Sequence, residues 1–246
     1  MYTLRTRFKK EIVSEFLPPK KRSNKVIIIC GGMPSYPSKR ELQFFFRKKN
    51  FWSFVPRYRG SWESDGTFMR KSPHLDVLDI VDSLPKGFAD SWSGKRYKVK
   101  APEIYLVGSS FGGPAVILAS KDRRVKKAVA ISPVTNWHDE TKLEPLNRVF
   151  KFSKMAYGNG YRLHGKNWDK LKTGKFFNPI FEINKLDPKK ILLIHAKDDT
   201  VVYAKSSKTF SKKLGCKLIL LKSGGHLGSD IVMEPAFWKQ VKEFFE

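Results

Sequence analysis

The chain has 246 residues, 41% of them hydrophobic, and its 48 Lys and Arg against 23 Asp and Glu give a formal net charge of +25. This length suits one α/β domain or two small ones, and the apolar fraction supports a sizeable core. No apolar run approaches the roughly 20 residues of a membrane-spanning helix, and the basic N-terminus lacks the apolar stretch of a secretory signal. We therefore expect a cytoplasmic protein without a membrane span.

The large positive charge has two interpretations. Such a field attracts nucleic acid, anionic lipid or acidic substrates. The basic residues are spread along the chain rather than gathered in one arm, however. An ordinary solvated surface is therefore favoured, and nucleic acid is a possible but less favoured partner. The sequence leaves the oligomeric state open.

Strand-like and helix-like segments alternate along most of the chain. Strands are predicted over residues 2–17, 26–30, 51–58, 104–107, 125–131, 191–195 and 217–221. Helices are predicted over residues 38–49, from 72 onward, 111–120, 203–214 and 234–245, the last with Phe237, Val241 and Phe244 on its core face. This alternation implies an α/β fold whose mostly parallel central sheet is covered by helices on both faces.

The stretch from about residue 135 to residue 188 interrupts the alternation. Residues 147–190 contain 11 Lys or Arg, 3 Asp or Glu and eight aromatic residues, and several glycines could let the segment move. We interpret it as a cap inserted into a single domain that spans residues 1–246. Its aromatic side chains either line an apolar substrate pocket or form the cap's own small core, and its lysines either attract an anionic substrate or are solvated.

Residues 104–116 are the most informative stretch. A short apolar strand leads into a helix through Gly108-Ser109-Ser110-Phe111-Gly112, which fits the pattern G-x-S-x-G. So tight a turn forces Ser110 into strained backbone angles and lifts its hydroxyl out of the sheet. The glycines are needed because side chains there would collide with the neighbouring strand and helix. Ser110 is therefore a candidate nucleophile.

Two further strand ends carry the groups that a serine nucleophile needs. Asp198 and Asp199 follow the strand at 191–195, and His226 follows the strand at 217–221. Catalytic groups in parallel sheets gather at the carboxyl ends of the strands. A serine hydroxyl needs an imidazole to take its proton, and the imidazole needs a carboxylate to fix its tautomer. We expect a Ser110, His226 and aspartate triad.

No cofactor or metal is expected. His74, His138 and His164 show no metal-ligand spacing, and His195 is expected to pack behind the site. Cys30 and Cys216 lie in apolar runs and are expected to be buried thiols in a reducing compartment.

In combination these motifs resemble the α/β-hydrolases, and among them the prolyl oligopeptidase-like serine hydrolases. The resemblance rests on Gly108–Gly113, on the stretch from Tyr58 to Gly66, on Asp198-Asp199-Thr200-Val201-Val202 and on Gly224-Gly225-His226. It implies the catalytic domain alone, because no region is long enough for the β-propeller of the large oligopeptidases. The sequence departs from the family pattern at Cys30, where a histidine is usual, and at Ala196, where a glycine is usual.

The resemblance leaves the triad acid open. If Ala196 stands at the family's usual glycine, the triad acid falls on Asp199. If the Asp-Asp-x-Val-Val run is aligned instead, the acid falls on Asp198. We favour Asp199. The oxyanion hole is expected to use the backbone N–H of Phe111 and a second N–H from Met33 or Gly32.

The expected function is hydrolysis through a covalent acyl-enzyme. The substrate would be an ester, a thioester or a small amide, possibly anionic. An esterase is slightly favoured over a peptidase, because the sequence offers no identifiable site for a free amine or a peptide backbone. The rival from another class is a basic protein that uses the same fold to bind nucleic acid or other anions.

Overall fold

The predicted strands assemble into one eight-stranded sheet. The computed structural model describes residues 2–246. The strand order is β1 (Leu4–Phe8), β2 (Ile12–Leu17), β4 (Trp52–Pro56), β3 (Lys25–Cys30), β7 (Glu103–Ser109), β8 (Val125–Ile131), β9 (Ile191–Ala196) and β10 (Lys217–Leu221). The β1–β2 and β2–β4 pairs are antiparallel, and every pair from β4 to β10 is parallel. The carboxyl ends of the six parallel strands therefore meet at one edge, where polar side chains that follow them come together.

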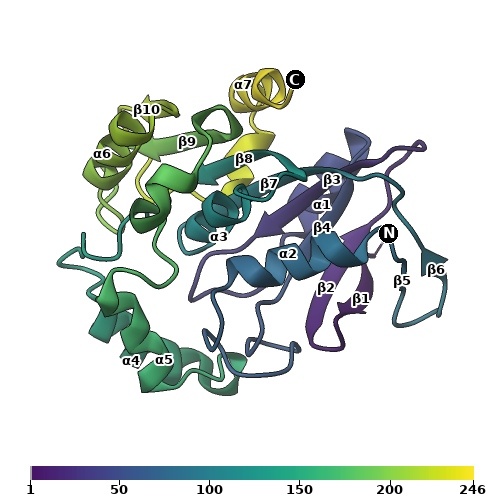
Figure 1. Cartoon of the computed structure of the whole chain (residues 1–246), viewed down its shortest axis with the longest axis horizontal. Coiled ribbons are helices and arrows are strands. Elements are labelled where there is room, and N and C mark those ends of the chain that lie inside the picture. Colours follow the sequence, from purple (N-terminus) through teal and green to yellow (C-terminus); the bar gives the residue numbers. More distant parts are fainter. Residues whose placement is uncertain (1) are drawn as a thin grey trace.

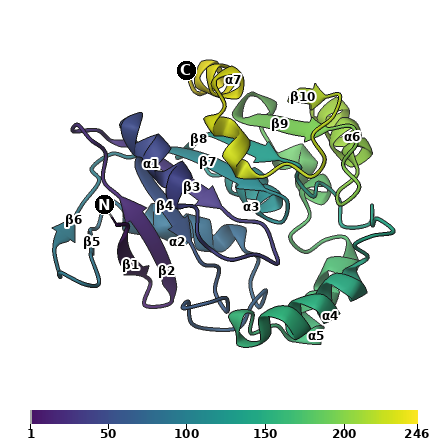
Figure 2. The same cartoon turned by 180° about the vertical axis from the view of Figure 1, so that it is seen from behind.

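Helices cover both faces of the sheet, as predicted (Figures 1 and 2). The helices α2 (His74–Ser83), α3 (Gly112–Ala119) and α6 (Ala204–Leu214) pack on one face, and α1 (Arg40–Lys48) and α7 (Pro235–Phe245) on the other. Alternate side chains of a strand enter opposite cores: Val26 and Ile28 face α2 and α3, whereas Ile27 and Ile29 face α1 and α7. All four are fully buried, which explains the continuous apolar run in the sequence.

The segment between β8 and β9 is helical and lies outside the sheet (Figure 1). It contains α4 (Leu146–Tyr157), α5 (Gly165–Trp168) and several 3₁₀ turns. Its apolar side chains are continuous with the core around α3, because Leu146, Trp168 and Phe177 belong to that cluster. Most of the aromatic residues of this segment therefore stabilise it by packing.

Backbone hydrogen bonds join this segment to the loop after β4. The N–H of Trp62 donates to Gly160 O (2.7 Å), that of Arg162 to Gly60 O (2.8 Å) and that of Phe68 to Arg162 O (3.0 Å). Residues 160–163 thus pair with the loop much as a short strand would. Such pairing fixes the segment against the body of the molecule along one side.

A few local features differ from the sequence prediction. A small hairpin of β5 (Phe88–Ala89) and β6 (Arg96–Tyr97) was not predicted, because two-residue strands show no alternation. In α7, Val241 and Phe245 are buried, whereas Phe237 and Phe244 are only partly buried.

The cysteines and the helix lengths also bear on the sequence predictions. Both cysteines are free and buried, as predicted. Within residues 2–246, no helix is long and apolar enough to cross a membrane.

Candidate active site

Ser110 lies at the tip of a strained turn between β7 and α3. Its φ angle is +52°, a left-handed value that non-glycine residues rarely adopt. The surrounding backbone is so close that the turn is possible only with glycine at positions 108 and 112. A Cβ atom on Gly108 would lie 2.3 Å from Gly112 O, and one on Gly112 would lie 2.1 Å from Cys30 O. This is the turn predicted from the G-x-S-x-G pattern, and it presents the serine at the carboxyl edge of the sheet.

Asp199 follows β9 and is held by four hydrogen bonds. Oδ1 accepts from the N–H groups of Val201 and Val202, both at 2.9 Å. Oδ2 lies 2.8 Å from His226 Nδ1 and 3.0 Å from His195 Nε2. Burial opposes ionisation of this carboxyl, but the hydrogen bonds from both histidines and from Val202 outweigh it, so its pKa is well below the usual range. Asp199 is therefore a carboxylate that orients imidazole rings.

His195 is fully buried behind Asp199. Its Nε2 faces two acceptors, Asp199 Oδ2 (3.0 Å) and Val202 O (2.8 Å), so this nitrogen carries the proton. Nδ1 then accepts from the hydroxyl of Ser207 at 2.8 Å. His195 thus holds Asp199 from the side opposite His226, as the sequence interpretation of a histidine packed behind the site expected.

Asp198 has a different environment from Asp199. Its carboxylate accepts from the N–H groups of Gly224 (3.2 Å) and Gly225 (2.9 Å), which lowers its pKa. Both glycines have positive φ angles, +144° and +62°, and lead directly into His226. Asp198 therefore shapes the loop that carries the histidine, whereas Asp199 contacts the histidine ring.

The histidine loop and the serine turn are joined at the carboxyl end of β8. The N–H of Ser110 donates to Ile131 O (2.9 Å), and the N–H of Leu227 donates to Ser132 Oγ (3.1 Å). Ser110 and His226 therefore lie on two loops anchored at adjacent residues. Because the Nδ1–H of His226 is directed to the carboxylate, its Nε2 is the nitrogen that can accept a proton.

The loop after β3 lies beside the serine. A Cβ atom on Gly32 would be 3.3 Å from Ser110 Cβ and 3.9 Å from its Oγ. Ser35 Oγ donates to Gly32 O (2.7 Å), which holds the loop in place. Met33 and Phe111 line the same pocket as Ser110. The three residues expected to supply oxyanion donors are thus gathered around the serine.

Cys30 is the residue at which the sequence departs from the family pattern described above. It is fully buried at the end of β3, and burial raises the pKa of its thiol to about 12. The thiol is therefore protonated at neutral pH and is not a competing nucleophile. Nearby, Tyr58 Oη donates to Gly31 O at 3.3 Å.

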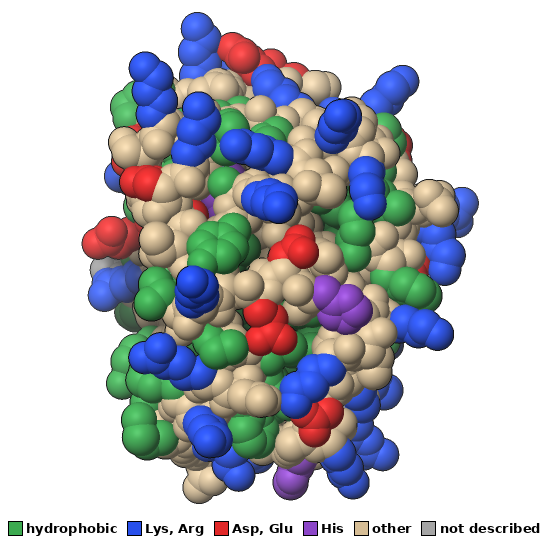
Figure 3. Space-filling model, turned by 90° about the vertical axis from the view of Figure 1, so that its left-hand side faces the viewer, with side chains coloured by type: hydrophobic (Ala, Val, Ile, Leu, Met, Phe, Trp, Pro, Cys, Tyr) green, Lys and Arg blue, Asp and Glu red, His purple; other side chains and the backbone are tan. Residues whose placement is uncertain are grey.

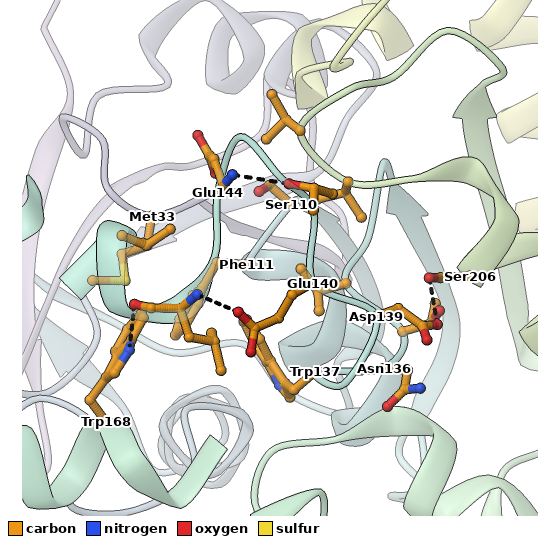
Figure 4. A pocket seen from close by; sticks show the side chains of 17 residues that line it. Met33, Ser110, Phe111, Asn136, Trp137, Asp139, Glu140, Glu144, Trp168 and Ser206 are labelled. Carbon is orange, nitrogen blue, oxygen red and sulfur yellow. Dashed lines mark hydrogen bonds between the residues drawn. The ribbon is translucent and has the colours of Figure 1, made fainter. Parts of the chain in front are cut away.

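A pocket opens next to Ser110, and Figure 4 shows the side chains around it. The space at the pocket, counted together with the solvent open to it, is about 610 Å³. Met33, Phe111, Trp137 and Trp168 supply apolar walls. Apolar walls with a few polar groups suit a small substrate or one side chain of a larger one.

The lining differs from what the sequence suggested. Of the cap aromatics considered as pocket walls, only Trp168 is among the lining residues; the others are Phe150, Phe152, Tyr157, Tyr161, Phe176 and Phe177. The carboxylates of Asp139, Glu140 and Glu144 line the pocket and were not anticipated. Their close spacing just before the basic stretch was the available signal, but no local pattern indicates which way they face.

The histidines of the described residues show no sign of a metal centre. Within residues 2–246, no three His, Cys, Asp or Glu residues lie close enough together to hold a metal ion.

Comparisons with known proteins agree with this architecture. An esterase of Pyrococcus furiosus has 19% identity and a TM-score of 0.69, covering 99% of this chain and 89% of that one. Est1E of Butyrivibrio proteoclasticus has 17% identity and a TM-score of 0.66 over all of both chains. An acylaminoacyl peptidase of Pyrococcus horikoshii has 21% identity and a TM-score of 0.66, covering 99% of this chain but only 40% of that one. No curated protein matches the sequence significantly.

These likenesses define an α/β-hydrolase fold. Residues 37–235 match the model of the prolyl oligopeptidase family, which is most of the chain. The chain therefore belongs to the prolyl oligopeptidase family and is a serine hydrolase, as its motifs predicted.

Proposed function

We propose that the protein hydrolyses an ester, a thioester or a small amide through an acyl-enzyme on Ser110. Ser110 Oγ bonds to the acyl carbon while His226 Nε2 takes its proton and then transfers it to the leaving group. Water attacks the acyl-enzyme in the second half of the reaction and restores the serine. Asp199 holds the imidazole in the required tautomer and stabilises the imidazolium.

The observation that carries this proposal is the 2.8 Å contact between His226 Nδ1 and Asp199 Oδ2, on loops anchored beside Ser110. The backbone N–H of Phe111 and that of Met33 or Gly32 are the proposed oxyanion donors. Each such donor typically contributes on the order of 10² to 10³ in turnover.

Esterase activity is favoured because acyl transfer to water needs only the triad and the oxyanion donors. Peptidase activity is the second candidate, and membership of the prolyl oligopeptidase family favours it. The ratio of turnover on an acyl ester to turnover on the matching anilide separates the two activities.

The test is covalent labelling with a fluorophosphonate, which reacts only with an activated serine. We expect labelling of the wild-type protein and none of Ser110→Ala, and we expect this variant to lose on the order of 10⁴ to 10⁶ in turnover of short p-nitrophenyl esters. Undiminished turnover in folded Ser110→Ala rules out Ser110 as the nucleophile.

The rival function is binding of nucleic acid or other anions by the basic surface. A wild-type protein that resists the probe but binds polyanions tightly at physiological salt would support it. We favour hydrolysis because a protein that only binds has no need for His226, Asp199 and a strained serine together.

A further inference from the structure

The pocket beside Ser110 is negatively charged in a strongly basic protein. Among residues 2–246, the carboxylates of Asp139, Glu140 and Glu144 line it and no Lys or Arg does. In the whole chain, by contrast, Lys and Arg outnumber Asp and Glu by 48 to 23. Figure 3 shows a similar contrast on the side at the left of Figure 1, where acidic side chains and a histidine lie near the middle and Lys and Arg surround them.

Hydrogen bonds hold two of these carboxylates in place. Asp139 Oδ2 accepts from Ser206 Oγ at 2.7 Å, and Glu140 Oε2 accepts from the N–H of Leu146 at 2.9 Å, at the start of α4 (Figure 4). Each bond uses one oxygen of its carboxylate. An ionised carboxylate offers about four lone-pair sites, so both groups retain the capacity to accept from a ligand.

Glu144 lies within electrostatic reach of the triad residues. Burial raises the pKa of its carboxyl; the charge of His226 acts in the opposite direction, and that of Asp199 adds to the increase. Glu144 and Ser110 also line the same pocket, so a group bound beside Glu144 would be close to the reacting bond.

The remaining polar features of the pocket also suit a ligand that donates hydrogen bonds. Thr135 lines the pocket with only 1% of its surface exposed, and its Oγ1 has no hydrogen-bond partner within the described part of the chain. The indole N–H groups of Trp137 and Trp168 are already used, by Phe177 O (2.7 Å) and Leu146 O (2.9 Å). The indoles can therefore offer their ring faces, which attract cations, and not their donors.

We propose that this pocket binds a positively charged group of the substrate, a primary ammonium or a guanidinium. The proposal rests on the proposed hydrolase function and specifies its substrate class. The three carboxylates supply the charge, Thr135 Oγ1 accepts one N–H, and the indole faces cover the alkyl part of the group.

The basic residues of the cap do not favour an anionic substrate. Lys170 Nζ donates to Met69 O (3.3 Å) and Arg70 O (3.0 Å), and Lys172 pairs with Asp169 at 2.7 Å. None of these lysines lines the pocket. Lys170 and Lys172 therefore act in anchoring and surface contacts, and within the described residues no Lys or Arg lines the pocket to pair with an anionic substrate.

Two matched substrate pairs test the proposal. The p-nitrophenyl esters of Nα-acetyl-lysine and Nα-acetyl-norleucine share a side chain of four carbons and differ in the terminal ammonium. The p-nitrophenyl esters of Nα-acetyl-arginine and Nα-acetyl-citrulline differ in the same way, because the first ends in a guanidinium and the second in a neutral urea of the same shape. We expect kcat/KM to be roughly tenfold higher for the cationic member of at least one pair. Equal or lower values for the cationic member in both pairs overturn the proposal.

Charge-removing variants show whether the pocket causes the preference. The double variant Glu140→Gln, Glu144→Gln keeps the oxygen that accepts from the Leu146 N–H, so we expect it to fold. It should lower the cationic-to-neutral ratio of kcat/KM by about fivefold or more. The matched control Glu243→Gln removes one exposed charge from α7 and should leave the ratio unchanged. A ratio that persists in the double variant places cation recognition elsewhere and overturns the proposal.

The two proposals fail in distinguishable ways. If the wild-type protein resists the fluorophosphonate and cleaves neither member of a pair, the hydrolase mechanism itself is wrong. If the wild type is labelled and cleaves both members equally, the mechanism stands and only the substrate class is wrong.

Discussion

Asp198 and Asp199 are neighbours in the sequence but hold different parts of the site. Asp199 contacts the ring of His226, whereas Asp198 accepts from Gly224 and Gly225 in the loop before it. We expect Asp199→Asn to lower turnover by roughly 10⁴, because an amide there favours the wrong imidazole tautomer. Asp198→Asn should cost far less, since the amide oxygen still accepts one N–H. Steady-state kcat on a short ester measures both, and the reverse order would make Asp198 the triad acid.

A pH dependence follows from the environment of Glu144. Its pKa is raised by burial, so its charge is lost at a higher pH than that of an exposed glutamate. The charged groups around it are His226, Asp199 and Arg148, together with the other two pocket carboxylates. As pH falls through the raised pKa, the preference for the cationic ester should weaken.

The lysine and norleucine esters serve as each other's control in this experiment. A change of pH that alters the catalytic step changes kcat/KM for both esters and cancels in their ratio, while the lysine ammonium stays charged throughout. A ratio that is constant between pH 8 and pH 4.5 contradicts the prediction.

At the residue scale, the sequence predicted the candidate groups that a short pattern or a strand end identifies. Ser110 was identified because the turn needs glycines on both sides, and His226 because it follows a strand end. Which of Asp198 and Asp199 contacts the ring of His226 depends on the path of the loop in space, which the sequence does not give. The acidic pocket could not be predicted, because the direction of Asp139 depends on its contact with Ser206 in α6 and that of Glu140 on where α4 begins.

At the scale of elements, the serine turn depends on contact between backbones. A Cβ atom on Gly112 would lie 2.1 Å from Cys30 O and 2.7 Å from Cys30 C. Neither atom belongs to a flexible side chain, so β3 and α3 would have to separate. We expect Gly112→Ala to lower the free energy of unfolding by about 3 kcal/mol or more, as measured by urea denaturation.

A nearby glycine provides the control. A Cβ atom on Gly31 would have no atom within 4 Å beyond its chain neighbours. Gly31→Ala should therefore change the free energy of unfolding by less than about 0.5 kcal/mol. If Gly112→Ala lowers the free energy of unfolding as little as Gly31→Ala does, the turn tolerates separation of β3 from α3.

The order and type of the long elements were predictable because burial on both sheet faces imposes continuous apolar runs such as Val26 to Cys30. The short elements were not predictable in the same way. The helix α5, for example, has only four residues, too few for a helical period to show in the sequence.

At the scale of the whole molecule, Arg162 joins the segment outside the sheet to the loop after β4. Its guanidinium donates to the carbonyls of Trp62 (3.0 Å), Gly66 (3.2 Å) and Asn159 (3.3 Å), and to that of Ser64. Arg162→Gln loses most of these charge-assisted bonds. We expect the free energy of unfolding to fall by about 2–4 kcal/mol, and proteolysis to begin within residues 135–188.

Arg123→Gln is a matched control, because Arg123 is an exposed arginine outside this segment. An equal loss of stability in both variants would show that the effect comes from net charge rather than from the link. Free movement of the cap remains a prediction, and it must involve the parts of the segment away from Arg162.

The two indoles of the pocket should make the intrinsic fluorescence sensitive to ligand binding. Trp137 and Trp168 are buried and face the space where a charged ligand is proposed to bind. A cation held there would place an electric field across both ring systems, and tryptophan emission responds to such fields in wavelength and intensity. The chain has six tryptophans, so part of the intrinsic fluorescence should change when Nα-acetyl-lysine is titrated in, and not with Nα-acetyl-norleucine. The pocket thereby carries its own reporter, which can follow ligand entry without any added dye and independently of turnover.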